Sequence, residues 1–141
     1  MRTSENGIAF IKAREGFTPI PTNDNGHRMW GHGHNQKPGE IEPTSIALDQ
    51  ADLLLRADLA RDVEPPLNRL APPTANQNQF DACASFTYNE GAGALAIMLH
   101  HGWSQVPVQM PAWHWEHING VLHDNKGLGV RRALEVALFN S

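Results

Sequence analysis

The sequence predicts a single α+β domain, mostly α-helical, with one small β-hairpin near the N-terminus. Apolar residues recur every three or four positions along several segments, which is the spacing of one helix face. Residues 17–34 are instead rich in Pro, Gly, Asn, Thr and aromatic side chains, a composition typical of a short irregular hairpin. With 141 residues, of which 40% are hydrophobic, the chain can bury a core without disulfide or metal crosslinks.

The first helix is expected to begin after Ser4, a good N-terminal capping residue. Ile8 and Ile11 then fall on one face of the helix. Gly16 is a typical C-terminal signal, and the prolines that follow it prevent the helix from continuing. Glu15 is therefore expected at the end of a rigid element.

Asn25-Gly26 is the most probable turn of the hairpin. Asp24 comes directly before this turn, nine positions after Glu15, so a helix end and a β-turn can present two carboxyl groups on opposite sides of a cleft. One protonated and one ionised carboxyl group are what the hydrolysis of a glycosidic bond requires. Glu and Asp are common on protein surfaces, so this pair carries weight only together with its sequence context.

The longest helical pattern is expected to open at Pro43-Thr44-Ser45. Its apolar positions repeat at spacings of three and four: Leu48, Ala51, Leu55 and Leu59. Pro65-Pro66 should break or kink this helix, because Pro65 has no N–H to donate and its ring clashes with the carbonyl of Arg61.

Three further helices are expected in the second half of the chain. Thr74 can cap the first of them, which stops at Gly91 and has one apolar side formed by Phe80, Cys83, Ala84 and Tyr88. A short helix ends near His101-Gly102, and residues 103–126 show no regular pattern beyond an Asn119-Gly120 turn. The last helix carries apolar residues at four-residue spacing, with two arginines beside them: Val130, Leu134 and Leu138, with Arg131 and Arg132.

Composition excludes several classes of protein. Cys83 is the single cysteine, so no internal disulfide forms, and its apolar neighbours predict a buried, inert thiol. The net charge of −4 argues against a nucleic-acid binder. The polar first residues, followed by Lys12 and Arg14, resemble neither a secretion signal nor a membrane span. We therefore expect a cytoplasmic protein without stable membrane association.

Five blocks of sequence, in this order, make the chain resemble the phage-type lysozymes, the endolysins or muramidases of glycoside hydrolase family 24. The blocks lie within residues 4–16, 24–34, 57–60, 77–95 and 127–139. The second block ends in Gly31-His32-Gly33-His34, and the last begins Gly127-Leu128-Gly129-Val130-Arg131-Arg132. Each block alone would be a weak signal, but together they are specific.

This resemblance implies a lysozyme-like fold with two lobes and a cleft between them. A small β-hairpin lobe would span about residues 15–45 and a connecting helix about residues 44–70. A helical lobe would combine about residues 71–141 with residues 1–14. If Pro65-Pro66 weakens the connecting helix, the two lobes could bend toward each other as substrate enters.

The resemblance also implies hydrolysis of the β-1,4 bond between N-acetylmuramic acid and N-acetylglucosamine in bacterial peptidoglycan, with inversion. Carried over, Glu15 is the general acid, and Asp24 orients and activates the water. Their carboxyl groups should then lie about 6.5–9.5 Å apart, to leave room for that water.

Further site residues follow from the same resemblance. Residues expected to bind substrate are Gly33, Tyr88, Asn89, Arg131 and Arg132, and one of the two arginines could also hold Glu15. His34 and Asp58 are expected to form a structural ion pair between the hairpin and the long helix. We expect a monomer that uses no cofactor or metal. It would stay in the producing cell until lysis and would need a membrane-permeabilising partner of the holin type to reach the wall.

The chain departs from the family pattern in the second block. Met29 occupies the position of the family's threonine and cannot hold a nucleophilic water, because a thioether is only a weak acceptor. One residue is also missing between Asp24 and Gly31, so Asn23 could occupy the expected aspartate position. We favour Asp24, because a neutral amide can neither activate water nor stabilise a developing positive charge.

Three alternative functions remain open. The departures at Met29 and at the deletion would suit a peptidoglycan-binding module with impaired catalysis. A zinc hydrolase could use His27, His32 and His34, although no acidic ligand set accompanies them. A partner-binding helical domain could use exposed tryptophans, but it would leave the glycine-histidine hairpin unexplained. The tryptophans in question are Trp103, Trp113 and Trp115.

Overall fold

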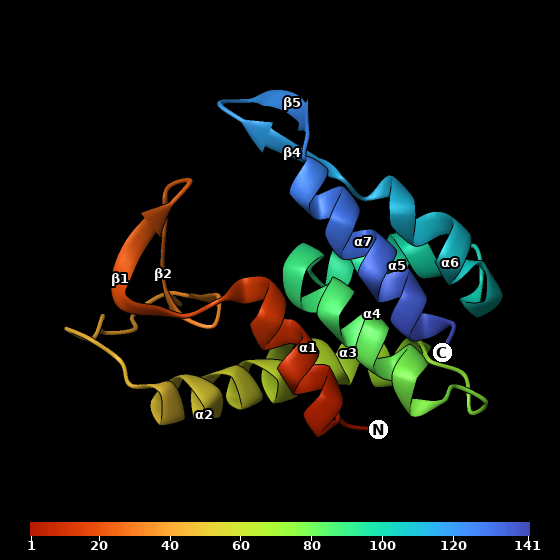
Figure 1. The fold of residues 1–141 in the computed structure, drawn as a ribbon, viewed down its shortest axis with the longest axis horizontal. Helices are drawn as coiled ribbons and strands as arrows, with labels where there is room; N and C mark the ends of the chain where they lie inside the picture. The colour runs from red at the N-terminus through yellow and green to blue at the C-terminus, as the bar shows by residue number, and fades with distance from the viewer.

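Helices make up most of the chain in the computed structural model, which describes residues 1–141, and two small antiparallel sheets accompany them (Figure 1). The helices are α1 (Glu5–Glu15), α2 (Leu48–Asp58), α3 (Glu64–Leu70), α4 (Gln77–Glu90), α5 (Ala92–Leu99), α6 (Val106–Gln109) and α7 (Lys126–Phe139). The strands are β1 (Thr18–Asp24), β2 (His27–Gly31), β3 (His34–Asn35), β4 (Trp115–Ile118) and β5 (Val121–Asp124). The predicted α+β, mostly helical class is confirmed.

Helix α1 begins and ends where the sequence predicts. The Ser4 hydroxyl accepts a hydrogen bond from the N–H of Gly7 (3.1 Å), and the carboxylate of Asp81 in α4 accepts one from the N–H of Ser4 (2.9 Å). Gly16 ends the helix with a φ of 70°, a conformation that favours glycine. Glu15 is thus the last residue of a helix whose N-terminus is anchored to α4.

The predicted hairpin is also confirmed, with Asn25-Gly26 as its turn. Both turn residues have positive φ, 49° and 85°, which suits the right-handed twist of the flanking strands. The register of β1 and β2 shifts between Thr18 and Thr22, where two prolines cannot donate to the sheet. Trp30, which pairs with His34 of β3, is buried, and β2 packs against α2.

Helix α2 starts at Leu48, so the predicted start at Pro43-Thr44-Ser45 is wrong. The N–H of Ile46 donates to the carbonyl of Pro19 in β1 at 2.8 Å. This hydrogen bond holds the segment before α2 against the hairpin. A contact that is distant in sequence therefore overrides the local capping signal.

Pro65-Pro66 does not break the helix, so the predicted break is wrong, while the predicted kink remains a prediction. The chain passes from α2 through a π-helical turn (Leu59–Val63) into α3 without leaving a helical path. In this wider turn the N–H of Glu64 donates to the carbonyl of Leu59, five residues back. The prolines then occupy the first turn of α3, where no intrahelical donor is needed. A broken helix is therefore not the basis of a hinge, and bending at these residues remains a prediction.

Helix α4 lies at the centre of the molecule and contacts α1, α3, α5 and α7. Every side chain from Phe80 to Thr87 is buried, as expected for a helix covered on all sides. Asn76, not the predicted Thr74, caps the helix in a reciprocal pair with Gln79 (2.9 and 3.2 Å). The predicted burial of Cys83 is confirmed, and burial raises the pKa of its thiol.

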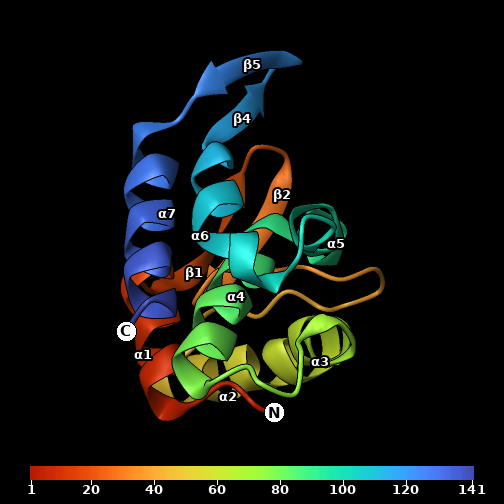
Figure 2. The same ribbon diagram turned by 90° about the vertical axis from the view of Figure 1, so that its right-hand side faces the viewer.

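Residues 103–126 contain elements that the sequence did not predict. Short 3₁₀ turns (Trp103–Gln105 and Met110–Ala112) flank α6, and a second hairpin follows, with its turn at Asn119-Gly120. In both views this β4–β5 hairpin projects beyond the N-terminal end of α7 (Figures 1 and 2). Its strands are four residues long and mostly exposed, so they lack the alternating apolar pattern that indicates a strand.

The apolar spacing in α7 marks the wrong face of that helix. Val130 and Leu134 are 62% and 41% exposed. The buried residues are instead Arg131, Arg132, Glu135 and Phe139. The buried face of α7 is therefore mainly ionic, which a search for apolar periodicity cannot detect.

The first sheet and the helical bundle lie on either side of α1. Figure 1 shows β1 and β2 on one side of α1, α4 and α7 on the other, and α2 running beneath them. The predicted boundaries between two lobes and a connecting helix remain a prediction. No helix has both the length and the apolar composition that crossing a membrane requires.

We expect Asp81→Ala to destabilise the fold. Asp81 is 1% exposed and accepts hydrogen bonds from the Ser4 backbone, the Ser4 hydroxyl and Gln77. Its loss leaves these donors without an acceptor, so the free energy of unfolding in urea should fall by about 2–3 kcal/mol. Asp49→Ala, at an exposed position in α2, is the control and should change it by less than about 0.5 kcal/mol. Equal effects of the two substitutions would contradict this anchoring role.

Candidate active site

The carboxyl group of Glu15 is held between α1, α7 and the first hairpin. Its Oε1 accepts a hydrogen bond from Nη1 of Arg131 at 2.6 Å, and its side chain is 17% exposed. On the hairpin side, a Cβ atom at Gly33 would lie 2.7 Å from Oε2 of Glu15. Gly33 also has a φ of +78°, so both its backbone and the space beside it require glycine.

Arg131 is fixed by buried partners of its own. Its Nε donates to Glu135 (3.1 Å) and its Nη2 to the carbonyl of Ser85 (3.2 Å), while the Ser85 hydroxyl donates to Glu135 (2.6 Å). Glu135 is fully buried. Burial raises the pKa of its carboxyl group, against the opposing effects of Arg132, Ser85 and Arg131. Because the other donors are committed, the guanidinium of Arg131 can present Nη1 to Glu15 in a single orientation.

Arg132 has a different role from the one predicted. It is fully buried and donates to Glu90 (3.1 Å) and Asn89 (2.8 Å). Its Nε also lies 2.8 Å from Oε2 of Glu135, an ion-pair distance without hydrogen-bond geometry. Arg131 alone therefore contacts Glu15, and the prediction that Arg132 binds substrate is wrong, because its side chain does not reach the surface.

A cavity of about 590 Å³ lies beside Gly33. It is bounded by the end of the first hairpin, by the continuous helix that runs from α2 into α3, and by the end of α4. Tyr88 lines it, packs against the core, and donates from its hydroxyl to the carbonyl of His32 at 2.8 Å. Burial raises the pKa of Tyr88, which keeps the hydroxyl a neutral donor. Asn89 is exposed and bound to Arg132, but it does not line this cavity.

Asp24 stands at the exposed tip of the hairpin, where its side chain makes no hydrogen bond or ion pair. The strand register places Asp24 and Met29 on the same face of the sheet. Asn23 points from the opposite face, and its side-chain oxygen accepts a hydrogen bond from the N–H of Gly26 at 3.0 Å. No hydrogen bond or ion pair joins Asp24 to Glu15.

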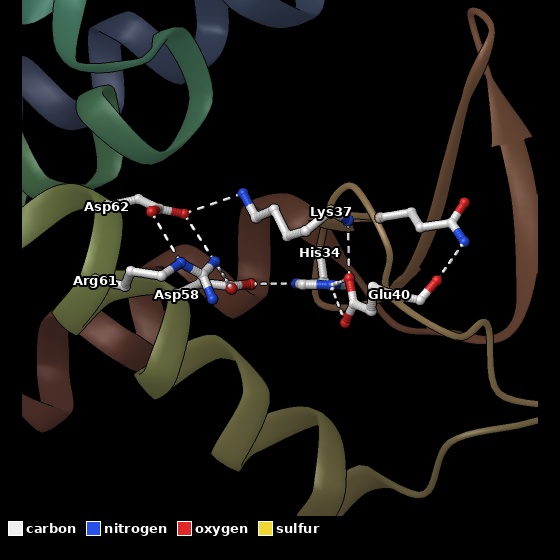
Figure 3. Close-up of polar contacts among 7 residues, drawn as sticks. His34, Lys37, Glu40, Asp58, Arg61 and Asp62 are labelled. Atoms are coloured by element: carbon white, nitrogen blue, oxygen red, sulfur yellow. Dashed lines mark hydrogen bonds and ion pairs between the residues drawn. The ribbon is translucent and has the colours of Figure 1, made fainter.

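The structure brings the predicted pair His34 and Asp58 together. Nδ1 of His34 lies 2.6 Å from Asp58, and its Nε2 lies 2.9 Å from Glu40, a third partner that the sequence did not suggest (Figure 3). Burial alone would lower the pKa of His34, but the hydrogen bonds to both carboxylates outweigh it and raise the pKa above its ordinary value.

A second set of charges extends this contact along the cavity. Figure 3 shows Arg61 between Asp58 and Asp62, at 2.6 and 2.8 Å, with Lys37 reaching Asp62 at 3.0 Å. The hydrogen bond from Arg61 is the main reason that the pKa of Asp62 falls to about 2. The segment after β3 is thus tied to the long helix by ion pairs at the cavity edge.

The three histidines of the zinc alternative do not converge. His32 is bound through Nδ1 to the carbonyl of Gly16 (2.6 Å), both nitrogens of His34 are taken by carboxylates, and His27 is exposed at the hairpin tip. No group of three or more His, Cys, Asp or Glu side chains in the structure is placed to hold a metal ion.

The sequence did not identify the residues that hold Arg131 and His34 in place. Ser85 carried no signal, but Glu135 did: it stands four and three positions after Arg131 and Arg132 on a predicted helix, a spacing typical of ion pairs. Glu40 could not be placed, because a loop connects it to β3.

Comparisons with known proteins identify the family of the chain. The family model for phage lysozyme matches residues 12–135. The chain is 35% identical to the endolysin of Bacillus phage PZA over 153 residues, covering 100% of this chain and 56% of that protein. It is 33% identical to the endolysin of Acyrthosiphon pisum secondary endosymbiont phage 1, covering 100% of this chain and 99% of that protein. The solved muramidase domain of SpmX from Asticaccaulis excentricus superposes with a TM-score of 0.82 at 30% identity, covering 99% and 98% of the two chains.

The mostly helical fold and the match to the phage lysozyme model define the class of the protein as a lysozyme-type glycoside hydrolase. Within that class, the chain belongs to the phage lysozyme family. It spans little more than half the length of its PZA relative and almost the full length of its endosymbiont-phage relative.

We expect Gly33→Ala to disturb Glu15 directly. The new methyl group would meet the carboxyl group at 2.7 Å. Gly39 has nearly the same φ, +77°, with no atom within 4 Å of an added Cβ, so Gly39→Ala isolates the backbone strain. Gly33→Ala should cost about 1–3 kcal/mol more stability than Gly39→Ala, and only Gly33→Ala should slow wall lysis, by at least about tenfold. Similar losses in both variants would show that Gly33 matters only for its backbone.

We expect His34→Asn to destabilise the protein most in mild acid. Because the pKa of His34 is raised by folding, its stabilisation is complete below the unfolded pKa and disappears as pH rises through the folded pKa. Near pH 5.5, where the carboxylates remain ionised, the substitution should cost about 3 kcal/mol, and less in alkaline buffer. His27→Asn, at an exposed position, is the control. A melting temperature that His34→Asn leaves unchanged in mild acid would refute the structural role of the pair.

Proposed function

We propose that this protein cleaves the β-1,4 bond between N-acetylmuramic acid and N-acetylglucosamine in bacterial peptidoglycan, with inversion. The single observation that carries the proposal is the carboxyl group of Glu15, which is fixed by Arg131 and lies against Gly33, a residue that lines the cavity. Its relatives are named as endolysins, and a protein of similar structure is named as a muramidase domain.

In this mechanism Glu15 donates a proton to the leaving oxygen, and Asp24 orients and activates a water molecule on the other side of the bond. Glu15 suits the first role because it is mostly shielded and held in one position. Asp24 suits the second because its carboxylate is free of protein partners. The two carboxyl groups should lie about 6.5–9.5 Å apart when substrate is bound.

Two features of the hairpin favour Asp24 over Asn23 for the second role. Asp24 shares a sheet face with Met29, at the position where the family carries its threonine. Asn23 lies on the other face and uses its side-chain oxygen to hold the turn. The ionisable group of Asp24 is thus on the same face as Met29.

Tyr88 and Asn89 are proposed to contact sugar across the cleft, with Gly33 lining it. The ring of Tyr88 offers an apolar surface to a pyranose face, and the amide of Asn89, oriented by Arg132, can read an N-acetyl group. Arg131 acts through Glu15 and is a positioning residue.

A peptidoglycan-binding module with impaired catalysis is the second candidate, because Met29 cannot hold a water molecule. Turbidity clearing of chloroform-treated bacteria separates the two. The wild-type chain should clear the suspension, whereas an impaired module would bind walls without clearing.

We expect Glu15→Gln and Asp24→Asn each to reduce clearing by at least about 100-fold, because each removes a proton-transfer group. Glu5→Gln, at the exposed start of α1, is the control for the first. Asn23→Asp, which keeps an acceptor for the turn, is the control for the second. Full activity of Asp24→Asn with a gain in Asn23→Asp would assign the second role to position 23. NMR of the fresh product should show the α-anomer at the new reducing end, and a β-anomer would exclude inversion.

A further inference from the structure

A second hollow, of about 530 Å³, lies between the β4–β5 hairpin and α5. Its walls include Trp113, Trp115, His117 and Leu122 on one side and Ile97 and His101 on the other. It shares no lining residue with the cavity beside Gly33, so it is a separate concave surface.

The register of the hairpin builds one wall of this hollow. Trp115 and His117 alternate onto the same face of β4, and Leu122 is the cross-strand partner of His117. Trp115 and Leu122 are 49% and 52% exposed, and Ile97 on the facing helix is 63% exposed. Exposed apolar groups gathered around a hollow and rimmed by polar side chains mark a binding surface.

Trp113, on the same side of the hollow as the hairpin residues, is anchored to the core. Trp113 is half-buried and packs edge-on against the buried Phe86, with 5.6 Å between ring centroids. Its ring therefore keeps its position, while Trp115 completes the hollow from the hairpin. A rigid aromatic floor lowers the entropy lost when a ligand is ordered on it.

The chemistry of the lining fits a sugar ring. A pyranose presents an apolar C–H face that packs on an aromatic ring and a rim of hydroxyl groups that needs polar partners. Polar partners are present in His101, His117 and Gln109. Glu90, the acidic group of the lining, is already paired with Arg132, so the site favours a neutral ligand over a cation.

We propose that this hollow is a saccharide site outside the catalytic cleft, which holds an N-acetylhexosamine unit of the wall glycan. This inference rests on the proposed function, which supplies a polymer of repeating sugars. The last turn of α4 separates the two sites, since Tyr88 lines the cavity and Glu90 lines the hollow. A second grip on the same polymer raises the effective concentration of enzyme at the wall between cuts.

The test uses binding in a Glu15→Gln background, so that the wall is not degraded. The probes are intact peptidoglycan sacculi and sacculi stripped of their peptides by an amidase. Trp115→Ala should weaken retention on both probes by about fivefold to tenfold, the loss expected for one stacking contact. Val121→Ala is the matched control, because Val121 is 57% exposed and lies on the other face of the hairpin.

Ile97→Ser tests the facing wall and does not depend on the hairpin remaining folded. Unchanged retention of Trp115→Ala and Ile97→Ser would overturn the proposal. Weaker retention on intact sacculi only would overturn it in favour of a peptide site. Failure of the proposed function is distinguishable, because it would appear as a wild-type chain that does not clear bacteria or as wall lysis that survives Glu15→Gln, whatever the binding result.

Discussion

The ion pair between Glu15 and Arg131 is the interaction on which the site depends. Burying an arginine and a glutamate is costly unless every donor and acceptor finds a partner. Here Ser85 and Glu135 complete the set, so the guanidinium is oriented by contacts on the side away from the cleft. The carboxyl group of Glu15 therefore takes its position from Arg131, which buried residues orient.

A second constraint is the set of contacts that holds the end of the first hairpin against the helices. Three consecutive residues make this contact: His32 accepts from Tyr88, Gly33 packs on Glu15, and His34 pairs with Asp58. Because successive residues bind different helices, a shift of this segment would disturb all three contacts together. The cavity between the first hairpin and the helices thus keeps its shape through contacts that three neighbouring residues make with distant parts of the chain.

The elements predicted well from sequence are those whose signals act within a few residues. Ser4 and Gly16 bound α1, and Asn25-Gly26 forms the first turn, because capping and turn geometry are local. The start of α2 was missed, since a hydrogen bond from Ile46 to a distant strand decides it. Family resemblance suggested an arginine for Glu15, but only the structure separates Arg131 from the buried Arg132, because both lie side by side on one helix.

Glu15 and its arginine are 116 positions apart in the chain. The ribosome releases α1 before α7. During most of the synthesis of this domain, Glu15 is therefore present without Arg131, the partner that orients it. Closing so long a loop is also among the slower steps of folding. The contact that orients Glu15 consequently forms only when translation of this domain is nearly over.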